Sequence, residues 1–212
     1  MSTEASLRED IATLGRLLAA LGLSHGSTGN ISVRLDDGWL LTPTNSRLGR
    51  LDPARIAKLD DDGRHLGGDK PSKEAFLHHC VYEMRTNARA IIHLHSTHSV
   101  AVSCLDGLDQ TDCLPPLTAY YVMRVGKLPV IPYFPPGDER LAKAVRKLAA
   151  NHASVLLANH GPVVAGTSLD SAAGAIEELE ATAKLFLLLK DEKTKPLSPD
   201  QVDELHQRFP KD

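Results

Sequence analysis

The chain has 212 residues, of which 42% are hydrophobic and 24% are charged, a balance typical of a soluble globular protein. Its 24 Lys and Arg residues against 27 Asp and Glu residues give a net charge of -3, so no general positive field would attract nucleic acid or an anionic membrane. We therefore expect a single domain over residues 1–212 that has no nucleic-acid or membrane partner.

Two features of the sequence favour the cytoplasm. Residues 1–10 are polar and acidic, and no apolar run approaches the ~20 residues that span a bilayer. The three cysteines, Cys80, Cys104 and Cys113, match neither a disulfide framework nor a CxxC zinc site. We expect a cytoplasmic protein with reduced thiols.

The first half of the chain alternates helix and strand signals. Its predicted elements are a helix over residues 7–21, strands over 31–35, 39–41 and 56–60, and a helix over 73–85. The Asp36-Asp37-Gly38 segment predicts a hairpin between the first two strands. Ser72 stands at the N-cap of the second helix, and Glu74 falls in its first turn.

The second half continues the alternation. Its predicted elements are strands over 90–95, 128–133 and 155–158, the last continuing over 163–165, and helices over 96–105, 138–150, 168–190 and after Ser198. Ser198-Pro199-Asp200-Gln201 has the pattern of a capping box. Helices around a sheet with at least one hairpin indicate α/β layers with a mixed or largely antiparallel sheet.

Three histidines form a candidate metal site. His93 and His95 are two residues apart in a predicted strand, so both side chains point to the same face. His160 follows a second apolar strand. Three histidines can supply the protein ligands of a catalytic zinc site and leave one position open. The alternative is that each imidazole is a satisfied, partly buried polar group.

Other residues compete for roles at this site, since the chain has ten histidines. His98 lies past the end of the predicted strand, and His78 and His79 lie in the middle of a helix, where a solvated or core position is the alternative. Glu74 is the candidate carboxylate. It could move a proton or complete the coordination shell, or it could only stabilise its helix, by roughly 0.3–1 kcal/mol.

Three loops are rich in hydrogen-bond donors: Gly26 to Asn30, Thr42 to Asn45, and Ser72 with Lys73. Backbone concavities and helix N-termini bind anions such as phosphate. None of the loops matches a Walker sequence or the GxGxxG fingerprint. Each loop alone could be a simple turn, whereas three of them near one metal site would form a phosphate pocket.

Five segments occur together in the order typical of the class II aldolase/adducin family, which this chain resembles. They are Gly26-Ser27-Thr28-Gly29-Asn30-Ile31-Ser32-Val33-Arg34, Leu41-Thr42-Pro43-Thr44, Lys70-Pro71-Ser72-Lys73-Glu74, His93-Leu94-His95-Ser96 and Leu157-Ala158-Asn159-His160-Gly161. The resemblance implies a three-layer α/β/α sandwich with a central, mainly antiparallel sheet. It also implies a homotetramer with active sites at the subunit interfaces.

The resemblance implies roles for individual residues as well. His93, His95 and His160 stand in the positions of the divalent-metal ligands, with Zn²⁺ as the expected ion, and Glu74 stands in that of the acid/base residue, which can also contact the metal. Phosphate or substrate contacts fall at six positions: Ser27, Asn30, Thr44, Asn45, Ser72 and Lys73. Asn45 replaces a frequent Gly of the aldolases and Lys73 a frequent second Ser, which leaves the detailed phosphate contacts open.

Further segments resemble a subgroup of the family that decarboxylates 3-oxo-tetronate 4-phosphate. They are Gly68 to Glu74, Tyr121 to Arg124, Pro136 to Asp138 and Glu177 to Glu180. The resemblance implies metal-dependent loss of carbon dioxide to give dihydroxyacetone phosphate through a metal-stabilised enediolate, in four-carbon acid sugar catabolism, with Glu74 delivering a proton. Tyr120 and Arg124 are candidate substrate contacts, and a structural salt bridge is the alternative for Arg124.

The family leaves other activities open. A fuculose-phosphate type aldolase and a ribulose-phosphate 4-epimerase would use the same metal. The epimerases and some aldolases rely on a tyrosine from a neighbouring or C-terminal segment, and the tail after Lys190 contains none. A non-enzymatic alternative is an adducin-like interaction domain, against which the joint presence of the three histidines and Glu74 argues.

Overall fold

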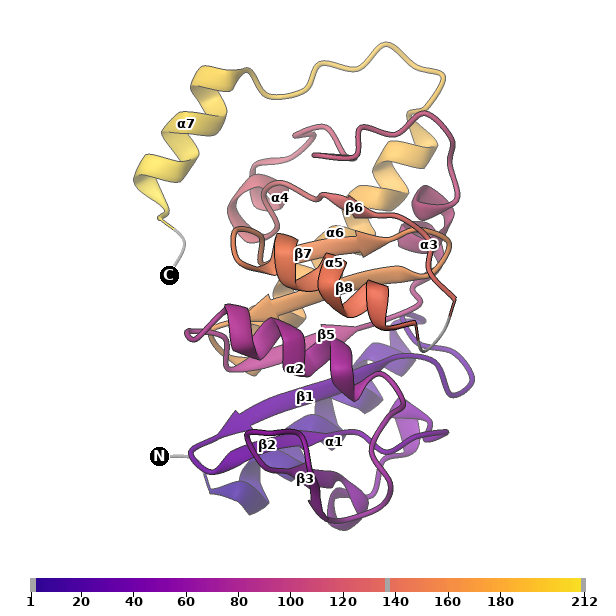
Figure 1. The fold of residues 1–212 in the computed structure, drawn as a ribbon. Coiled ribbons are helices and arrows are strands. Elements are labelled where there is room, and N and C mark those ends of the chain that lie inside the picture. Colours follow the sequence, from indigo (N-terminus) through magenta and orange to yellow (C-terminus); the bar gives the residue numbers. More distant parts are fainter. Residues whose placement is uncertain (1–2, 136–137, 211–212) are drawn as a thin grey trace.

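One sheet runs through the whole molecule. The computed structural model describes residues 3–135 and 138–210, so Pro136 and Gly137, part of a segment that resembles the decarboxylase subgroup, lie outside the described residues. Eight strands follow the order β4-β3-β2-β1-β5-β8-β7-β6 (Figure 1). Neighbouring strands are antiparallel except for the parallel pair β6 and β7. The predicted mainly antiparallel sheet is confirmed.

The elements alternate along the chain much as expected. The strands are β1 (Asn30–Leu35), β2 (Gly38–Leu41), β3 (Ala57–Leu59), β4 (His65–Gly67), β5 (Ala90–His93), β6 (Val130–Ile131), β7 (Ser154–Leu157) and β8 (Gly161–Gly166). The helices are α1 (Glu4–Ala20), α2 (Ala75–Met84), α3 (Thr97–Ser103), α4 (Ala119–Arg124), α5 (Glu139–Ala149), α6 (Leu169–Leu188) and α7 (Pro199–Arg208). Two short 3₁₀ helices, η1 (Leu48–Arg50) and η2 (Pro53–Arg55), lie between β2 and β3.

Helices cover both faces of the sheet, which confirms the three-layer α/β/α sandwich. Buried side chains of α1, α3, α4 and α6 form one apolar cluster with the sheet, centred on residues such as Ile11, Ile92 and Ile176. Buried side chains of α2 and α5 form a second cluster on the opposite face, with residues such as Leu77 and Val145. Figure 1 shows α2 and α5 in front of the sheet and α6 behind it. The burial of these two apolar layers drives the fold.

The C-terminal helix α7 stands apart from the layers. It has the predicted capping box, because the Ser198 hydroxyl accepts from the Gln201 N–H at 3.3 Å and the Gln201 side chain accepts from the Ser198 N–H at 2.9 Å. None of its residues is buried. Figure 1 shows it at the end of an extended segment, beside α4 and away from the sheet.

Three predicted boundaries near the candidate site are wrong. Strand β5 ends at His93, so His95 lies beyond it. Residues 163–165 do not continue the strand of residues 155–158, because the chain reverses at Asn159, whose φ of 56° turns it into the antiparallel strand β8. Helix α2 begins at Ala75, which leaves Glu74 at the N-cap position. The elements β4 and α4 were not predicted.

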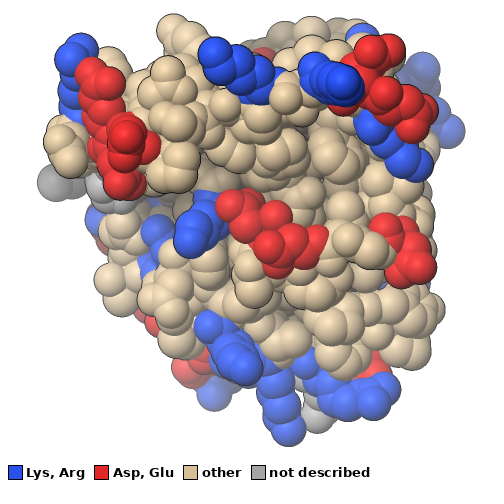
Figure 2. Space-filling view, turned by 90° about the horizontal axis from the view of Figure 1, so that it is seen from above, with Lys and Arg blue, Asp and Glu red and all other residues tan. Residues whose placement is uncertain are grey.

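The surface carries both charge signs. Figure 2 shows Lys and Arg interspersed with Asp and Glu on the face seen from above. Ion pairs such as Lys58–Asp37 at 2.7 Å and Arg146–Glu83 at 2.7 Å join charged groups of the protein surface. None of the described helices combines the length and the apolar character that a bilayer span requires. Cys80, Cys104 and Cys113 are free thiols, as expected.

Candidate metal centre and substrate pocket

The sheet brings the three predicted histidine ligands to one edge. Strands β5 and β8 pair antiparallel, with His93 opposite Val163, so the end of β5 lies beside the start of β8. His93 is the last residue of β5, His95 follows two residues later, and His160 lies in the turn that enters β8. Segments more than 60 residues apart in the chain therefore meet at one point.

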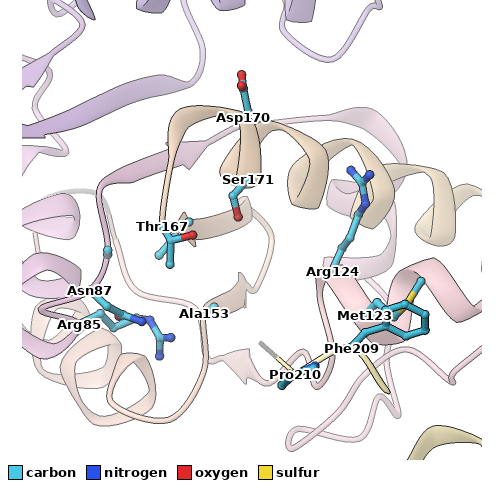
Figure 3. A pocket seen from close by; sticks show the side chains of 13 residues that line it. Arg85, Asn87, Met123, Arg124, Ala153, Thr167, Asp170, Ser171, Phe209 and Pro210 are labelled. Atoms are coloured by element: carbon cyan, nitrogen blue, oxygen red, sulfur yellow. The ribbon is translucent and has the colours of Figure 1, made fainter. Parts of the chain in front are cut away.

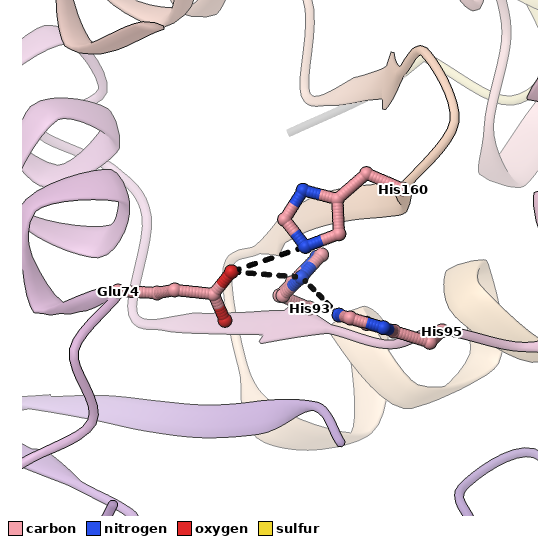
Figure 4. A group of neighbouring side chains, drawn as sticks. All are labelled: Glu74, His93, His95 and His160. Carbon is pink, nitrogen blue, oxygen red and sulfur yellow. Dashed lines mark hydrogen bonds and ion pairs between the residues drawn. The ribbon is translucent and has the colours of Figure 1, made fainter. Parts of the chain in front are cut away.

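The ring nitrogens of the histidines converge. The Nε2 atoms of His93 and His95 are 3.1 Å apart. The ring centroids of the three histidines lie 4.6, 4.8 and 5.0 Å apart, and the ring planes meet at 63° to 90°. Figure 4 shows the rings turned toward a common point. Bonds of about 2.0–2.1 Å to a tetrahedral Zn²⁺ would separate two nitrogens by about 3.3 Å, which the observed spacing matches.

A backbone contact fixes the tautomer of His93. This side chain is fully buried, and its Nδ1 lies 2.8 Å from the carbonyl oxygen of Pro162. A carbonyl oxygen only accepts, so Nδ1 carries the proton and donates. In the neutral ring, the Nε2 lone pair is then free and faces the cluster. Such a second hydrogen bond is the usual means of orienting a metal-ligating histidine.

Glu74 completes a group of four candidate ligands. Its Oε1 lies 3.1 Å from Nε2 of His160 and 3.6 Å from Nε2 of His93. The candidate ligand atoms of Glu74, His93, His95 and His160 all lie within 4.8 Å of one another. Figure 4 shows one carboxylate oxygen directed at the histidines and the other turned away from them. Three imidazoles and one carboxylate form a donor set that suits a divalent transition metal.

The cluster electrostatically favours a bound cation. Burial opposes ionisation of Glu74, yet the charges and hydrogen bonds of His93 and His160 hold its pKa far below the usual value. Burial, followed by the neighbouring His93 and His160, lowers the pKa of His95 to about 3. A neutral His95 has a lone pair available at neutral pH, as metal binding requires. Burial acts against the charged form of His93 too, but Glu74 raises its pKa.

The competing histidines lie outside the cluster. His98 pairs through Nδ1 with Glu180 at 2.8 Å. His79 contacts the carbonyl oxygen of Asp61 at 2.9 Å. His78 is fully buried between α2 and the sheet. A polar role for His78 was not predicted, although Glu74 lies four residues before it, at the N-cap position of the same helix.

The predicted donor-rich loops lie side by side next to Glu74. The N–H of Thr44 donates to the carbonyl of Lys70 at 2.9 Å, and the N–H of Ser72 donates to the carbonyl of Thr42 at 3.2 Å. The Asn30 amide reaches the Ser72 hydroxyl at 3.2 Å, which ties the third loop to the other two. The structure thus gathers the three loops at the edge of the sheet that carries the histidines.

The individual phosphate candidates differ in exposure. Ser27, Asn45 and Lys73 are exposed, Thr44 and Ser72 are partly buried, and Asn30 is buried. The backbone at Asn45 has a φ of 56°, a left-handed conformation that favours glycine and that asparagine adopts more readily than most other residues. Asn45, which stands where the aldolases often have Gly, can therefore adopt the left-handed conformation that the loop has here.

Two candidate substrate residues lie elsewhere in the chain. Arg124 lines a cavity of about 460 Å³ together with Gly166 and Thr167, at the end of β8 opposite to His160 (Figure 3). Its guanidinium lies 5.7 Å from the ring centroid of the exposed Tyr120, a cation–π contact. No carboxylate among the described residues forms a salt bridge with Arg124. Within one chain, neither residue is brought to the histidine cluster.

Comparisons with known proteins agree with this arrangement. The family model for the class II aldolase and adducin N-terminal domain matches residues 9–187. A 3-oxo-tetronate 4-phosphate decarboxylase from Pectobacterium atrosepticum is 49% identical over 97% of this chain and 94% of the relative. The crystal structure of YgbL from Klebsiella pneumoniae is 46% identical, with a TM-score of 0.95 over 97% of this chain and 100% of that one. An L-fuculose phosphate aldolase from Escherichia coli is 33% identical over 80% of this chain and 77% of the relative.

Proposed function

The chain belongs to the class II aldolase and adducin family, and on this basis we propose that it is a 3-oxo-tetronate 4-phosphate decarboxylase. The reaction releases carbon dioxide and forms dihydroxyacetone phosphate. One observation carries the proposal: the cluster of Glu74, His93, His95 and His160 occurs in a chain that is 49% identical to a decarboxylase over nearly its full length. Identity to the aldolase is lower, at 33% over 80% of the chain.

The family's dependence on a divalent metal fits the residues present. We assign His93, His95 and His160 as the ligands, and Zn²⁺ as the ion. When bound, the ion supplies positive charge that stabilises the electron pair left behind as carbon dioxide departs. The chain contributes the Nδ1–H bond from His93 to Pro162 that aims one ligand, and a low-pKa His95 that stays neutral at physiological pH.

The reaction requires one proton for each turnover. The bond between the carboxylate carbon and the adjacent hydroxyl-bearing carbon breaks, and the electron pair enters an enediolate that includes the 3-oxo group. Adding a proton to the former hydroxyl-bearing carbon forms dihydroxyacetone phosphate. We assign this proton delivery to Glu74, whose Oε1 faces the histidines and whose side chain is 24% exposed. Because the resting carboxylate is ionised, it takes the proton up from solvent during each turnover, and its partial exposure gives it that access.

The phosphate group would bind at the three donor-rich loops. The exposed Ser27, Asn45 and Lys73 offer a hydroxyl, an amide and an ammonium group, and backbone hydrogen bonds join Thr44 to Lys70 and Ser72 to Thr42. Charge and hydrogen-bond donors suit a phosphate better than the apolar end of a substrate. This arrangement would hold the phosphorylated end of the substrate while its carboxyl end reaches the metal.

Four expectations from the sequence remain part of this proposal. They are a single domain over residues 1–212, a homotetramer, active sites at subunit interfaces and a cytoplasmic location. The position of Arg124 and Tyr120 at the far end of β8 means that they would contact substrate only across such an interface.

The test is to follow carbon dioxide and dihydroxyacetone phosphate after adding 3-oxo-tetronate 4-phosphate to the metal-loaded protein. The proposal predicts equal amounts of both products. The alternative, a sugar-phosphate aldolase, has the same metal residues and predicts release of an aldehyde from fuculose 1-phosphate with no carbon dioxide. Turnover of neither substrate would favour an adducin-like interaction domain.

A further inference from the structure

A buried polar contact runs between α2 and β1 beside the metal centre. His78 and Tyr82 share one side of α2, and Glu74 lies four residues before His78 at the N-cap position of this helix. Asn30 and Ser32 are two residues apart and share one face of β1. Four of these side chains are nearly inaccessible: His78 and Ser32 are 0%, Asn30 is 2% and Tyr82 is 5% exposed, whereas Glu74 is 24% exposed. We call these five residues the polar seam. Buried polar groups cost stability unless they are hydrogen-bonded.

Hydrogen bonds join the polar seam without interruption. The Tyr82 hydroxyl lies 2.8 Å from the Ser32 hydroxyl, which lies 2.7 Å from Nδ1 of His78. Nε2 of His78 contacts Oδ1 of Asn30 at 2.5 Å. Nδ2 of Asn30 donates to Oε2 of Glu74 at 2.7 Å. The chain of contacts therefore ends on the carboxylate that we assign as the proton donor.

The direction of every bond in the polar seam follows from its last member. An ionised carboxylate only accepts, so Asn30 must present its NH₂ group to Glu74 and its oxygen to His78. Nε2 of His78 must then donate, which leaves Nδ1 as an acceptor for the Ser32 hydroxyl. Ser32 in turn accepts from Tyr82. All four bonds point toward Glu74, an alignment in which each bond polarises the next.

The surroundings of His78 hold its ring in the required state. Its ring stacks on that of Trp39, with the ring centroids 6.5 Å apart and the planes at 8° to each other. Trp39 is itself held by its Nε1–H, which donates to the Asp60 carbonyl at 2.9 Å. Burial, followed by the charge of His93, lowers the pKa of His78 to about 3. A neutral imidazole has one donor and one acceptor, which are the two groups that the polar seam uses.

We propose that His78 is a positioning residue for Glu74: its Nε2–H fixes the Asn30 amide, which holds Oε2 of Glu74 and keeps Oε1 directed at the three histidines. This inference rests on the proposed function, since the position of Glu74 affects turnover only if it serves the reaction. The Asn30 amide donates its two N–H groups to Oε2 of Glu74 at 2.7 Å and to the Ser72 hydroxyl at 3.2 Å. Asn30 therefore holds the carboxylate only while its NH₂ group faces Glu74.

Two substitutions of similar size separate the two hydrogen bonds of His78. Gln places an amide N–H near the former Nε2 and can still donate to Asn30, whereas Asn places an amide oxygen near the former Nδ1 and keeps only the contact with Ser32. His78→Asn is expected to lower kcat about 10- to 100-fold, the usual effect of removing an outer-shell partner. The KM, metal content and melting temperature of His78→Asn should stay near those of His78→Gln. The His78→Gln variant should retain most of the wild-type kcat.

His79→Gln is the matched control, because His79 is the next residue of the same helix and contacts a carbonyl oxygen on the surface. It should leave kcat unchanged. Equal kcat values for His78→Gln and His78→Asn would overturn the proposal. The proposal would also be overturned if both variants lost kcat together with an equal loss of melting temperature. That result would show that His78 has only a structural role.

The tautomer of His78 gives a test that needs no substrate. Both His78 and His79 stack on Trp39, so the His78 signal is the one near Trp39 that persists in His79→Gln. Nitrogen NMR of the protein with ¹⁵N-labelled histidine should show, for this signal, a neutral ring protonated at Nε2 at pH 7. A ring protonated at Nδ1 would overturn the proposal. If the wild-type protein released no carbon dioxide, the proposed function would fail, and the tautomer would still decide whether the polar seam points toward Glu74.

Discussion

Substitution of Gly161 by Ala should weaken metal binding as well as folding. Gly161 directly follows His160 and has a φ of 149°. A Cβ at this position would lie 2.3 Å from the carbonyl oxygen of Leu94 and 3.4 Å from Cα of His95. Leu94 separates His93 from His95, so a single methyl group would push apart the two segments that carry the ligands.

The magnitude follows from the geometry of Gly161. Carbon and oxygen atoms in close contact normally lie about 3.3–3.6 Å apart, so the two backbones must separate by about 1 Å. A displacement of about 1 Å in a preorganised site can cost about 100-fold in function. We expect the affinity for Zn²⁺ to fall about 10- to 100-fold. The strained backbone adds an unfolding penalty on the order of 1–3 kcal/mol.

Calorimetric titration of the metal-free protein with Zn²⁺ measures the affinity, and urea unfolding measures the stability. Gly107→Ala is the control: Gly107 has a φ of 74° and no atom within 4 Å of the added Cβ. This control should lose stability through backbone strain and keep its metal affinity. Wild-type affinity in Gly161→Ala would refute the reasoning that this close contact positions the ligands.

Three further predictions concern Glu180, Glu74 and the metal. Burial acts to raise the pKa of Glu180, but hydrogen bonds from Ser99 and from the backbone N–H of His98 hold this pKa below the ordinary value of 4.5. A carboxyl group whose pKa is lower in the folded than in the unfolded protein stabilises the fold at pH values above its unfolded pKa. This stabilisation is lost as the pH falls through the pKa of the folded state. The difference in free energy of unfolding between wild type and Glu180→Gln should therefore shrink below pH 4.5, and a constant difference in urea titrations would be contrary evidence. Glu74→Gln should retain metal by elemental analysis while kcat for carbon dioxide release falls about 10²- to 10⁴-fold; near-normal turnover would remove Glu74 from the mechanism. Chelation should lower the melting temperature and Zn²⁺ should restore it, because a ligand at 100 times its Kd stabilises by about 2.7 kcal/mol; an unchanged melting temperature would argue against a structural link between metal and fold.

Local patterns in the sequence predicted most elements of the fold. The Asp36-Asp37-Gly38 turn correctly placed the hairpin of β1 and β2, and Asp138 and Ser198 cap the helices that were expected to start there. These signals act within a few residues, so periodicity and capping rules detect them. The three-layer architecture followed from the resemblance and is confirmed.

The candidate site was predicted for a reason that is only partly correct. His93 and His95 were expected on one face of a strand, yet β5 ends at His93 and the ring of His95 reaches the cluster from beyond the strand. The turn at Asn159 that delivers His160 depends on a left-handed backbone conformation, which the strand pattern of its neighbours concealed. Pairing between β5 and β8 then brings the ligands together.

Contacts between distant segments could not be predicted. His78 was expected at a solvated or core position in the middle of a helix, and it is buried. No local rule connects it to Asn30, 48 positions earlier. The position of Arg124 at the end of β8 opposite to His160 depends on the packing of α4 against α6, which the sequence pattern does not contain. Such contacts arise from tertiary packing, and helix and strand signals do not predict which distant residues will meet.

Titration of the metal-free protein with Zn²⁺ while carbon dioxide release from 3-oxo-tetronate 4-phosphate is recorded tests the central claim most directly. The four-residue cluster predicts that activity rises linearly and stops at about one ion per chain, with one dihydroxyacetone phosphate formed for each carbon dioxide. The His93→Ala/His95→Ala double variant should remain inactive at every metal concentration. Full activity in the metal-free protein would contradict the account.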